Sequence, residues 1–268
     1  MADLSGGWNF RDVSTSTGGA VRPGVLFRSG ELTKIDDTGL SQLQDIRLTD
    51  VADLRSPREI ERHGGDRVPD GVVVHLLPFL DIVATVEGEA PHEHAFQRLL
   101  TEKPDDETIL EAGRRYMTEE YRRFAQAPGA RTAVHRMVTL LCDDGRSVLT
   151  HCFAGKDRTG FGVAVILAAA GVDHDAVMDD YLQSNSAIPQ LREQIMDMIA
   201  RRFEDGIPFE AEEFTKARLS DDVLGVRAEY LDAAFDTVRA EHGSVAGYLR
   251  AAGITDEEIT SLRAALLG

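Results

Sequence analysis

Short apolar segments alternate with longer segments of helical periodicity along the first 170 residues of the chain. Short apolar runs bounded by turn residues are typical of buried β-strands, whereas apolar positions spaced three and four residues apart predict amphipathic helices. The last 100 residues carry only the helical pattern. The predicted strands cover residues 25–28, 50–54, 72–77 and 147–151, and the predicted helices cover residues 37–46, 57–63, 107–125, 130–142, 159–170, 175–184, 188–203, 209–217, 225–242 and 256–266.

This order of elements predicts an α/β fold. We expect a central, mostly parallel sheet of four or five strands flanked by helices on both faces, with the helical C-terminal half packed on or over it. Asp173 and Thr255 precede two of the helices and are predicted N-caps. The pattern predicts loops at residues 86–93 and 103–107, because glycine, proline and charged residues interrupt the apolar positions there.

Composition and charge narrow the possible functions. The chain has 268 residues and a formal net charge of −17. Duplex nucleic acid would be repelled by this excess of acid, although an anionic substrate can still bind in a locally positive pocket. The longest apolar run, residues 161–172, is too short for a bilayer, which needs about 20 residues. The first residues show no basic patch and no apolar region, so we expect no Sec signal peptide.

One motif carries specific chemistry. The predicted strand at 147–151 leads directly into a loop in which five residues separate a cysteine from an arginine, and an apolar helix follows. Such a loop can turn successive backbone N–H groups inward as an anion nest, and the helix adds the positive end of its dipole. The sequence therefore predicts a phosphate-binding loop, with contacts from Phe153, Ala154, Gly155, Lys156, Asp157 and Arg158.

The motif also predicts a nucleophile. Arg158 can grip two phosphate oxygens, and the same positive field favours the thiolate form of Cys152 at neutral pH. Thr159 can donate its hydroxyl to that thiolate, and His151 can hold the loop by hydrogen bonds. A thiolate beneath a bound phosphoryl group can attack phosphorus in line and form a phosphocysteine, which water then hydrolyses. The alternative is a buried structural cysteine beside a surface Lys-Asp-Arg cluster.

At these residues the sequence resembles the cysteine-based protein tyrosine phosphatases. More narrowly it resembles the mycobacterial protein tyrosine phosphatase B type, an atypical branch that acts on phosphotyrosine, on phosphoserine and phosphothreonine, and on phosphoinositides. The resemblance covers nearly the whole chain. Besides the Cys152 loop it includes residues 8–13, 26–29, 49–56, 74–79, 116–122, 214–220 and 223–227.

The resemblance implies a single phosphatase domain over residues 1–268 with a helical lid at about 186–222, formed by the helices predicted at 188–203 and 209–217. It places the family's phosphoinositide-associated lysine on Lys156. It also implies a protein that stays in the cytoplasm or is secreted by a leaderless route. The activity implied is metal-free and needs no cofactor; the partners are a phosphorylated protein or phosphoinositide substrate and inorganic phosphate as product.

The general acid that must protonate the leaving oxygen is less well defined. Ordinary tyrosine phosphatases take it from a loop about thirty residues upstream, but residues 122–141 contain no Asp or Glu. Asp157 lies inside the loop and is favoured by the resemblance, although it could instead only shape the loop as an ion-pair partner. Asp81 follows the strand at 72–77, at the strand end where α/β sites gather, or is a solvated loop carboxylate.

Three alternatives to a protein phosphatase stay open. The chain could be primarily a phosphoinositide phosphatase, since Lys156 beside Asp157 and Arg158 favours a multiply phosphorylated head group. It could be a non-catalytic phosphate-binding module. It could also transfer sulfur as rhodanese-type enzymes do, although the Arg158-Thr159-Gly160 ending fits phosphate better.

Four weaker signals have simple alternative explanations. Cys142 could protect Cys152 as a disulfide or pack as a small apolar side chain. The residues His92, Glu93 and His94 lack two further metal ligands, so a loop is the better interpretation. The helix at 188–203 has an apolar stripe that faces either the core or the site, formed by Leu191, Ile195, Met198 and Ile199. An ion-pair network behind the loop, or surface pairing, is expected for Arg11, Asp12, Asp53 and Arg55.

Overall fold

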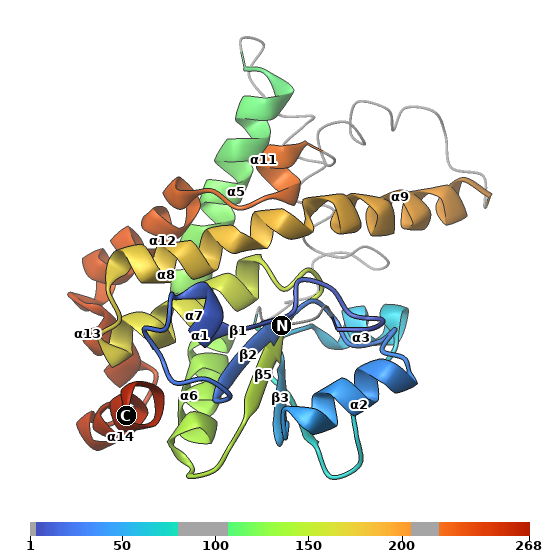
Figure 1. The fold of residues 1–268 in the computed structure, drawn as a ribbon. Helices are drawn as coiled ribbons and strands as arrows, with labels where there is room; N and C mark the ends of the chain where they lie inside the picture. Colours follow the sequence, from blue (N-terminus) through green and yellow to red (C-terminus); the bar gives the residue numbers. More distant parts are fainter. Residues whose placement is uncertain (1–3, 80–106, 205–219) are drawn as a thin grey trace.

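A computed structural model describes residues 4–79, 107–204 and 220–268. A five-stranded sheet in the order β1-β2-β5-β3-β4 lies between helices on both of its faces (Figure 1). Strand β1 runs antiparallel to β2 and the other neighbours are parallel, which confirms the predicted fold class. The strands are β1 (Arg11–Asp12), β2 (Leu26–Ser29), β3 (Asp50–Asp53), β4 (Val73–Leu76) and β5 (Val148–His151).

Helices occupy most of the remaining described chain. The predicted N-caps are confirmed, since Asp173 accepts from the N–H of Asp175 and Thr255 from that of Glu258. The helices are α1 (Val13–Ser16), α2 (Asp37–Asp45), α3 (Pro57–His63), α5 (Ile109–Gln126), α6 (Pro128–Cys142), α7 (Asp157–Ala170), α8 (His174–Leu182), the 3₁₀ helix η1 (Gln183–Ala187), α9 (Ile188–Glu204), α11 (Asp221–Leu224), α12 (Ala228–His242), α13 (Val245–Ala251) and α14 (Asp256–Leu267).

Most predicted ends are shifted by no more than two residues, but two differences are larger. The helix predicted at 225–242 is wrong at its start, because α11 and α12 are separated there by extended residues around Gly225. The short elements β1, α1, α11 and α13 are absent from the prediction, because so few residues carry no readable period. The helix predicted at 209–217 and the loop predicted at 86–93 lie outside the described residues, as does almost all of the loop at 103–107.

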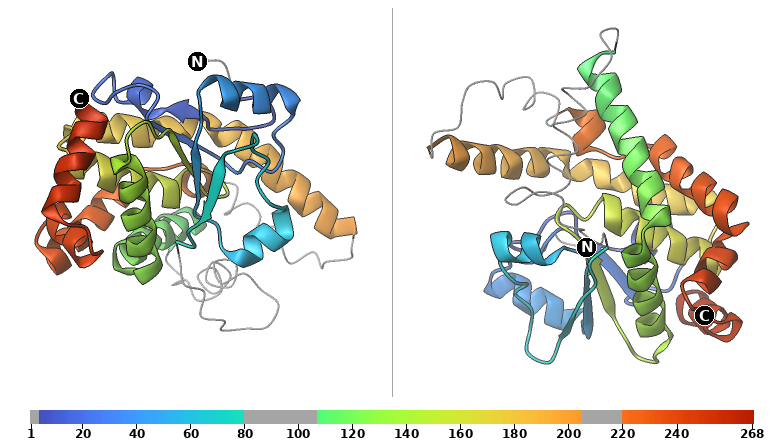
Figure 2. Two further views of the ribbon diagram at one scale, coloured as in Figure 1. Left: turned by 90° about the horizontal axis from the view of Figure 1, so that it is seen from below. Right: turned by 180° about the vertical axis from the view of Figure 1, so that it is seen from behind.

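The two faces of the sheet pack against different partners because side chains alternate along each strand. Phe27, Val51 and Leu149 point to the face that α2 covers with Leu43. The neighbouring residues Leu26, Ala52 and Val148 point to the opposite face and join the larger core beneath α6 and α7. Helices α12, α13 and α14 form a further layer outside α5, α6 and α7 (Figure 2).

The parallel strands bring three chain segments to one edge of the sheet. Ser29 and Asp53 are both paired with His151, so β2, β3 and β5 end side by side. In parallel sheets ligands bind beyond these carboxyl ends. The segment between β5 and α7 begins at this edge, and it contains the predicted phosphate-binding loop. The first half of α9 passes over it, and the second half extends away from the body (Figure 1).

In the described part of the chain, no helix combines the length and the apolar character that a bilayer crossing requires. The expectation of a cytoplasmic protein, or of one secreted by a leaderless route, stays a prediction.

Replacing Phe161 by Ala should lower the free energy of unfolding by about 3–5 kcal/mol. The ring of Phe161 is fully buried against Phe79, Phe124 and Tyr248, so its removal leaves a cavity that the helices cannot close. Urea unfolding followed by circular dichroism measures the loss. Leu267→Ala is the control, because this side chain is 43% exposed and its loss should cost at most about 0.5 kcal/mol. Equal effects of the two substitutions would contradict the packing described.

Candidate active site

Cys152 lies directly after β5 and is 2% exposed. The loop that follows it turns sharply at Gly155, whose φ is +65°. A Cβ atom at Gly155 would lie 2.0 Å from the carbonyl oxygen of Ser29. Only glycine therefore fits between this turn and the end of β2.

Every backbone carbonyl from Cys152 to Lys156 is bound by a donor of the protein. His151 Nδ1 lies 3.2 Å from the oxygen of Cys152, and the N–H of Glu31 donates to Phe153 at 3.0 Å. The Nδ2 group of Asn9 donates to Ala154 at 3.1 Å and to Gly155 at 3.0 Å. A guanidinium nitrogen of Arg28 also donates to Gly155 and, more weakly, to Lys156 at 2.9 and 3.4 Å.

This carbonyl binding fixes where the loop's N–H groups point. In a trans peptide the N–H points opposite to the preceding carbonyl, so the N–H groups of residues 153–157 face away from these donors. Within the described chain none of the five has an acceptor. They lead into the N-terminus of α7, whose first N–H groups are also free for an anion. The loop thus has the donor arrangement that an anion nest requires.

Arg158 is held by a carboxylate that the sequence analysis did not identify. Its two Nη atoms lie 2.7 and 2.8 Å from the two oxygens of Glu59 on α3. Glu59 is also the capping-box residue of Ser56. Burial alone would raise the pKa of Glu59, but Arg158 lowers it well below its usual range. Burial would likewise lower the pKa of Arg158, yet Glu59 and the nearby Cys152 raise it. A guanidinium has five N–H groups, so donors remain for phosphate.

Asp157 and Lys156 form an ion pair with each other, and both also bind residues outside the loop. The ammonium of Lys156 lies 3.0 Å from the carboxylate of Asp157 and donates to the carbonyls of Val223 and Gly225 at 2.8 and 3.1 Å. These contacts use all three donors of the ammonium group. The hydroxyl of Tyr121 donates to Asp157 at 3.1 Å. Lys156 therefore ties the loop to the α11 region in this structure.

The remaining predicted site residues differ in their placement. The hydroxyl of Thr159 is fully buried and has no partner among the described residues, so the expected hydrogen bond to Cys152 is not formed here. Gly160 allows close packing, since a Cβ atom would lie 2.9 Å from the ring of Tyr181. The ring of Phe153 packs edge-on against that of Trp8, with 5.9 Å between the ring centroids. Asp81 lies outside the described residues, as do His92, Glu93 and His94.

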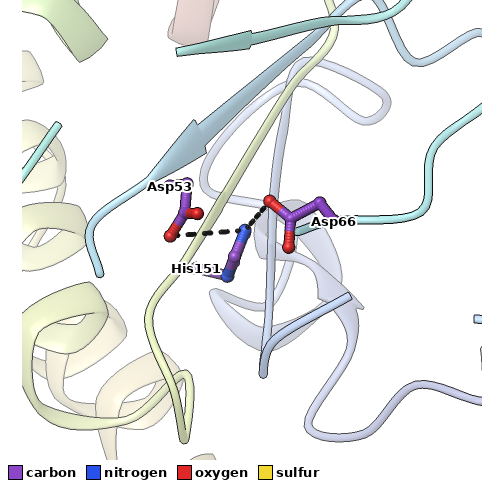
Figure 3. A group of neighbouring side chains, drawn as sticks. All are labelled: Asp53, Asp66 and His151. Atoms are coloured by element: carbon purple, nitrogen blue, oxygen red, sulfur yellow. Dashed lines mark hydrogen bonds and ion pairs between the residues drawn. The ribbon is translucent and has the colours of Figure 1, made fainter. Parts of the chain in front are cut away.

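A buried ionic network supports the loop from the side of β3 (Figure 3). His151 Nε2 lies 2.8 Å from Asp66 and 3.9 Å from Asp53. Arg55 lies 2.8 Å from each of these carboxylates and 3.2 Å from Glu31. Asp53, Asp66 and His151 are residue types that bind metals, but the guanidinium of Arg55 already pairs with both carboxylates and the imidazole nitrogen is hydrogen-bonded to one of them. We assign the group as an ion-pair network.

A second buried network lies under the other side of the loop. Asp180 on α8 pairs with Arg11 at 3.1 Å and with Arg28 at 2.5 Å. The expectation that Arg11, Asp53 and Arg55 pair behind the loop is therefore confirmed, and surface pairing is wrong for them because all three are buried. The expectation is wrong for Asp12, whose carboxylate accepts from the N–H groups of Ser14 and Gly24 instead.

A model described as the tyrosine phosphatase family matches residues 2–268. The chain belongs to this family. It is 54% identical to the triple specificity protein phosphatase PtpB of Mycobacterium tuberculosis over 276 residues, which cover 100% of this chain and 99% of that protein. It is 31% identical to a putative tyrosine-protein phosphatase of Cupriavidus necator, over 90% of this chain and 80% of that one. The predicted family and the predicted class of enzyme, a protein tyrosine phosphatase, are confirmed.

Within this phosphatase, Glu120 on α5 is a carboxyl group that the sequence analysis missed. It lies two residues before the stretch at 122–141, which contains no Asp or Glu. Glu120 is 9% exposed, and burial raises its pKa although Arg123 opposes the shift; Asp157 raises it further. Tyr121, the next residue, contacts Asp157 through its hydroxyl. This closeness of α5 to the loop depends on the tertiary structure, so the sequence could not predict it.

Two weaker signals are resolved by the same geometry. Cys142 ends α6 beside the amino end of β5, whereas Cys152 follows the carboxyl end, so the strand separates the two thiols and a disulfide would need a large rearrangement. The pKa of Cys142 is raised to about 11, mainly by burial and further by the nearby Glu258. In the apolar stripe of α9, Leu191 and Ile195 pack with Ala154 of the loop. The described half of that stripe therefore covers the site.

Asp66→Asn should destabilise the enzyme by about 2 kcal/mol near pH 5.5 and by less as the pH rises. Burial lowers the pKa of His151, but Asp66 outweighs burial and raises it above its ordinary value. A raised pKa adds stability that is fully present below the unfolded value of about 6.5 and is lost as the pH rises through the folded value.

Urea unfolding of both proteins at about pH 5.5, 7 and 9 tests this pH dependence. The difference in free energy of unfolding between wild type and Asp66→Asn should shrink from the first pH to the last. A difference that grows with pH would show that His151 does not carry the positive charge.

Proposed function

We propose that the protein hydrolyses phosphate monoesters, phosphotyrosyl protein first among them, through a phosphocysteine on Cys152. The observation that supports this most is the binding of all five carbonyls from Cys152 to Lys156 on one side of the loop. It leaves a row of N–H donors around the sulfur, with Arg158 following at the N-terminus of α7. A doubly charged phosphoryl group matches this set of donors better than a persulfide does.

The proposed reaction has two displacement steps. The thiolate of Cys152 attacks phosphorus, the bond from phosphorus to the ester oxygen breaks, and the leaving oxygen takes a proton from a carboxyl group. Water then attacks the phosphocysteine, the carboxylate accepts its proton, the phosphorus–sulfur bond breaks and inorganic phosphate leaves. Arg158 and the loop N–H groups stabilise the charge on the phosphoryl oxygens in both steps. The residues assigned here need neither metal nor cofactor.

Asp157 is our first assignment for the general acid. It belongs to the loop that binds the phosphoryl group, and Tyr121 and Lys156 fix its orientation. Asp81 stays the second candidate from the sequence. Glu120 is a third, because its buried carboxyl has a raised pKa and is close enough to Asp157 and Arg158 to be affected by both.

The range of substrates is the finer part of the proposal. The relative from Mycobacterium tuberculosis is named a triple specificity phosphatase, which supports hydrolysis of phosphoserine and phosphothreonine as well. Phosphoinositides are the alternative substrate class. If Lys156 binds their head groups, it must first leave the carbonyls of Val223 and Gly225. We also propose residues 186–222 as a lid, since Leu191 and Ile195 pack over Ala154 while Cys152 is 2% exposed.

Phosphate release by wild-type protein from a phosphotyrosine peptide should persist with EDTA and a reducing agent, and it should vanish in Cys152→Ser. The serine lacks a thiolate, but the loop donors stay, so the variant should still bind inorganic phosphate. Cys142→Ser is the matched control, because that thiol lies beyond the opposite end of β5 and should keep full activity. Turnover retained in Cys152→Ser would remove the nucleophile from the proposal.

A soluble phosphatidylinositol phosphate assayed in parallel gives the ratio between the two substrate classes. A lipid rate above the peptide rate would make the phosphoinositide the primary substrate. No turnover on either substrate would favour a non-catalytic phosphate-binding module, and a thiosulfate assay would then test sulfur transfer.

Asp157→Asn should lower kcat about 100-fold for an alkyl phosphate and far less for p-nitrophenyl phosphate. The poor leaving group needs a proton as it departs, whereas nitrophenolate does not. Asp81→Asn and Glu120→Gln, measured with the same two substrates, identify the acid. Dependence on the leaving group in either of these variants, and not in Asp157→Asn, would move the assignment to that residue.

A further inference from the structure

Asn9 connects the N-terminal segment to the phosphate loop in a way that depends on its amide. Its φ of +52° is in the left-handed region, which Asn tolerates better than most residues. The side-chain oxygen accepts from Arg11 at 2.7 Å, so the Nδ2 group is directed to the carbonyls of Ala154 and Gly155. One side chain therefore fixes two consecutive peptide planes of the loop.

Arg28 fixes the same part of the loop from β2. It is fully buried, and one of its terminal nitrogens donates to Gly155, to Lys156 and to the hydroxyl of Ser184. Its other terminal nitrogen pairs with Asp180 at 2.5 Å. The guanidinium thus joins α8 to the carbonyl side of the loop, opposite the N–H groups.

The buried cluster carries more positive than negative charge. Asp180 is the carboxylate partner of two guanidinium groups, those of Arg11 and Arg28, and it accepts from Ser16 as well. Burial and the nearby Arg28 together lower the pKa of Arg11 to about 10, although Asp180 opposes the shift. An excess buried charge is costly in the free protein. It is favourable once an anion, either a thiolate or a phosphoryl group, lies across the loop.

We propose that Asn9 and Arg28 are positioning residues for the phosphatase reaction. By binding the carbonyls of Ala154, Gly155 and Lys156, they hold the N–H donors of residues 155–157 toward the bound phosphate. With Arg11 they also place one excess positive charge behind the Cys152 loop. Both effects stabilise the thiolate and the phosphoryl oxygens. The proposal rests on the function proposed above.

The test compares Asn9→Asp, Arg28→Lys and Arg28→Met with wild type. Asn9→Asp keeps the shape of the side chain and its contact with Arg11. It replaces the NH₂ group, and so both N–H donors, by an oxygen that faces the carbonyls of Ala154 and Gly155. Arg28→Lys keeps a positive charge beside Asp180. A single ammonium cannot, however, bind Asp180 and the carbonyl of Gly155 through two separate nitrogens as the guanidinium does. Arg28→Met removes both contributions. Arg146→Met is the control, because Arg146 pairs with a buried carboxylate, Asp50, at the amino end of β3.

Two measurements report on the loop independently of overall stability. One is the pH midpoint for alkylation of Cys152 by iodoacetamide, and the other is the inhibition constant of inorganic phosphate. The tested substitutions leave the other charged groups around the loop unchanged. Those groups are Arg11 from β1, Asp53 from β3, Arg55, Glu59 from α3, Asp66, Glu120 from α5, His151 from β5, Lys156 of the loop, Asp157 and Arg158 from α7, and Asp180 from α8.

We expect Asn9→Asp and Arg28→Met to raise the alkylation midpoint by about one pH unit and to weaken phosphate inhibition about tenfold. Arg28→Lys should fall between Arg28→Met and wild type, and Arg146→Met should match wild type. The proposal would be overturned if the variants fold and have the alkylation midpoint and the phosphate inhibition constant of wild type. If Arg28→Met does not fold, Asn9→Asp provides the test. Wild-type protein without Cys152-dependent turnover would instead refute the proposed function.

Discussion

The geometry of the loop from Cys152 to Lys156 depends on hydrogen bonds to its carbonyl groups. An isolated loop would turn its N–H groups toward any available acceptor, because each peptide is free to rotate as a plane. Here the five carbonyls from Cys152 to Lys156 are held by His151, Glu31, Asn9 and Arg28. The N–H groups of residues 153–157 are therefore directed to the opposite side before any substrate arrives. Such preorganised donors need no rearrangement during the reaction.

Charge is distributed around this loop in three buried or half-buried groups with different tasks. Glu59 balances Arg158 and holds its plane by two hydrogen bonds. The network of Asp53, Asp66 and Arg55 anchors His151. The third group, in which Asp180 faces two guanidinium groups, has positive charge in excess. The whole chain has a formal net charge of −17, so any attraction of an anion to the loop must come from local charge and not from the protein as a whole.

The C-terminal half contributes a cover as well as support. Lys156 binds the carbonyls of Val223 and Gly225, and Leu191 and Ile195 of α9 pack with the loop residue Ala154. On the opposite side, α8 provides Asp180 and the buried Tyr181, whose hydroxyl donates to Tyr121 at 2.8 Å. The loop is therefore enclosed between two regions that both follow it in the sequence. Cys152 itself packs with the larger core and is 2% exposed.

The sequence by itself determined the features that depend on neighbouring residues. Strands and helices could be located from local periodicity, and Cys152, Arg158 and Gly155 could be identified from their spacing between a strand and a helix. The partners of these residues could not be predicted, because Glu59, Asp66 and Asp180 look like ordinary surface carboxylates until the fold buries them. Asn9 and Gly155 are 146 residues apart in the chain, and Arg11 and Asp180 are 169 apart. Only the sheet order, which brings β2, β3 and β5 to one edge, decided which charges meet behind the loop, because pairing between distant residues leaves no local pattern to read.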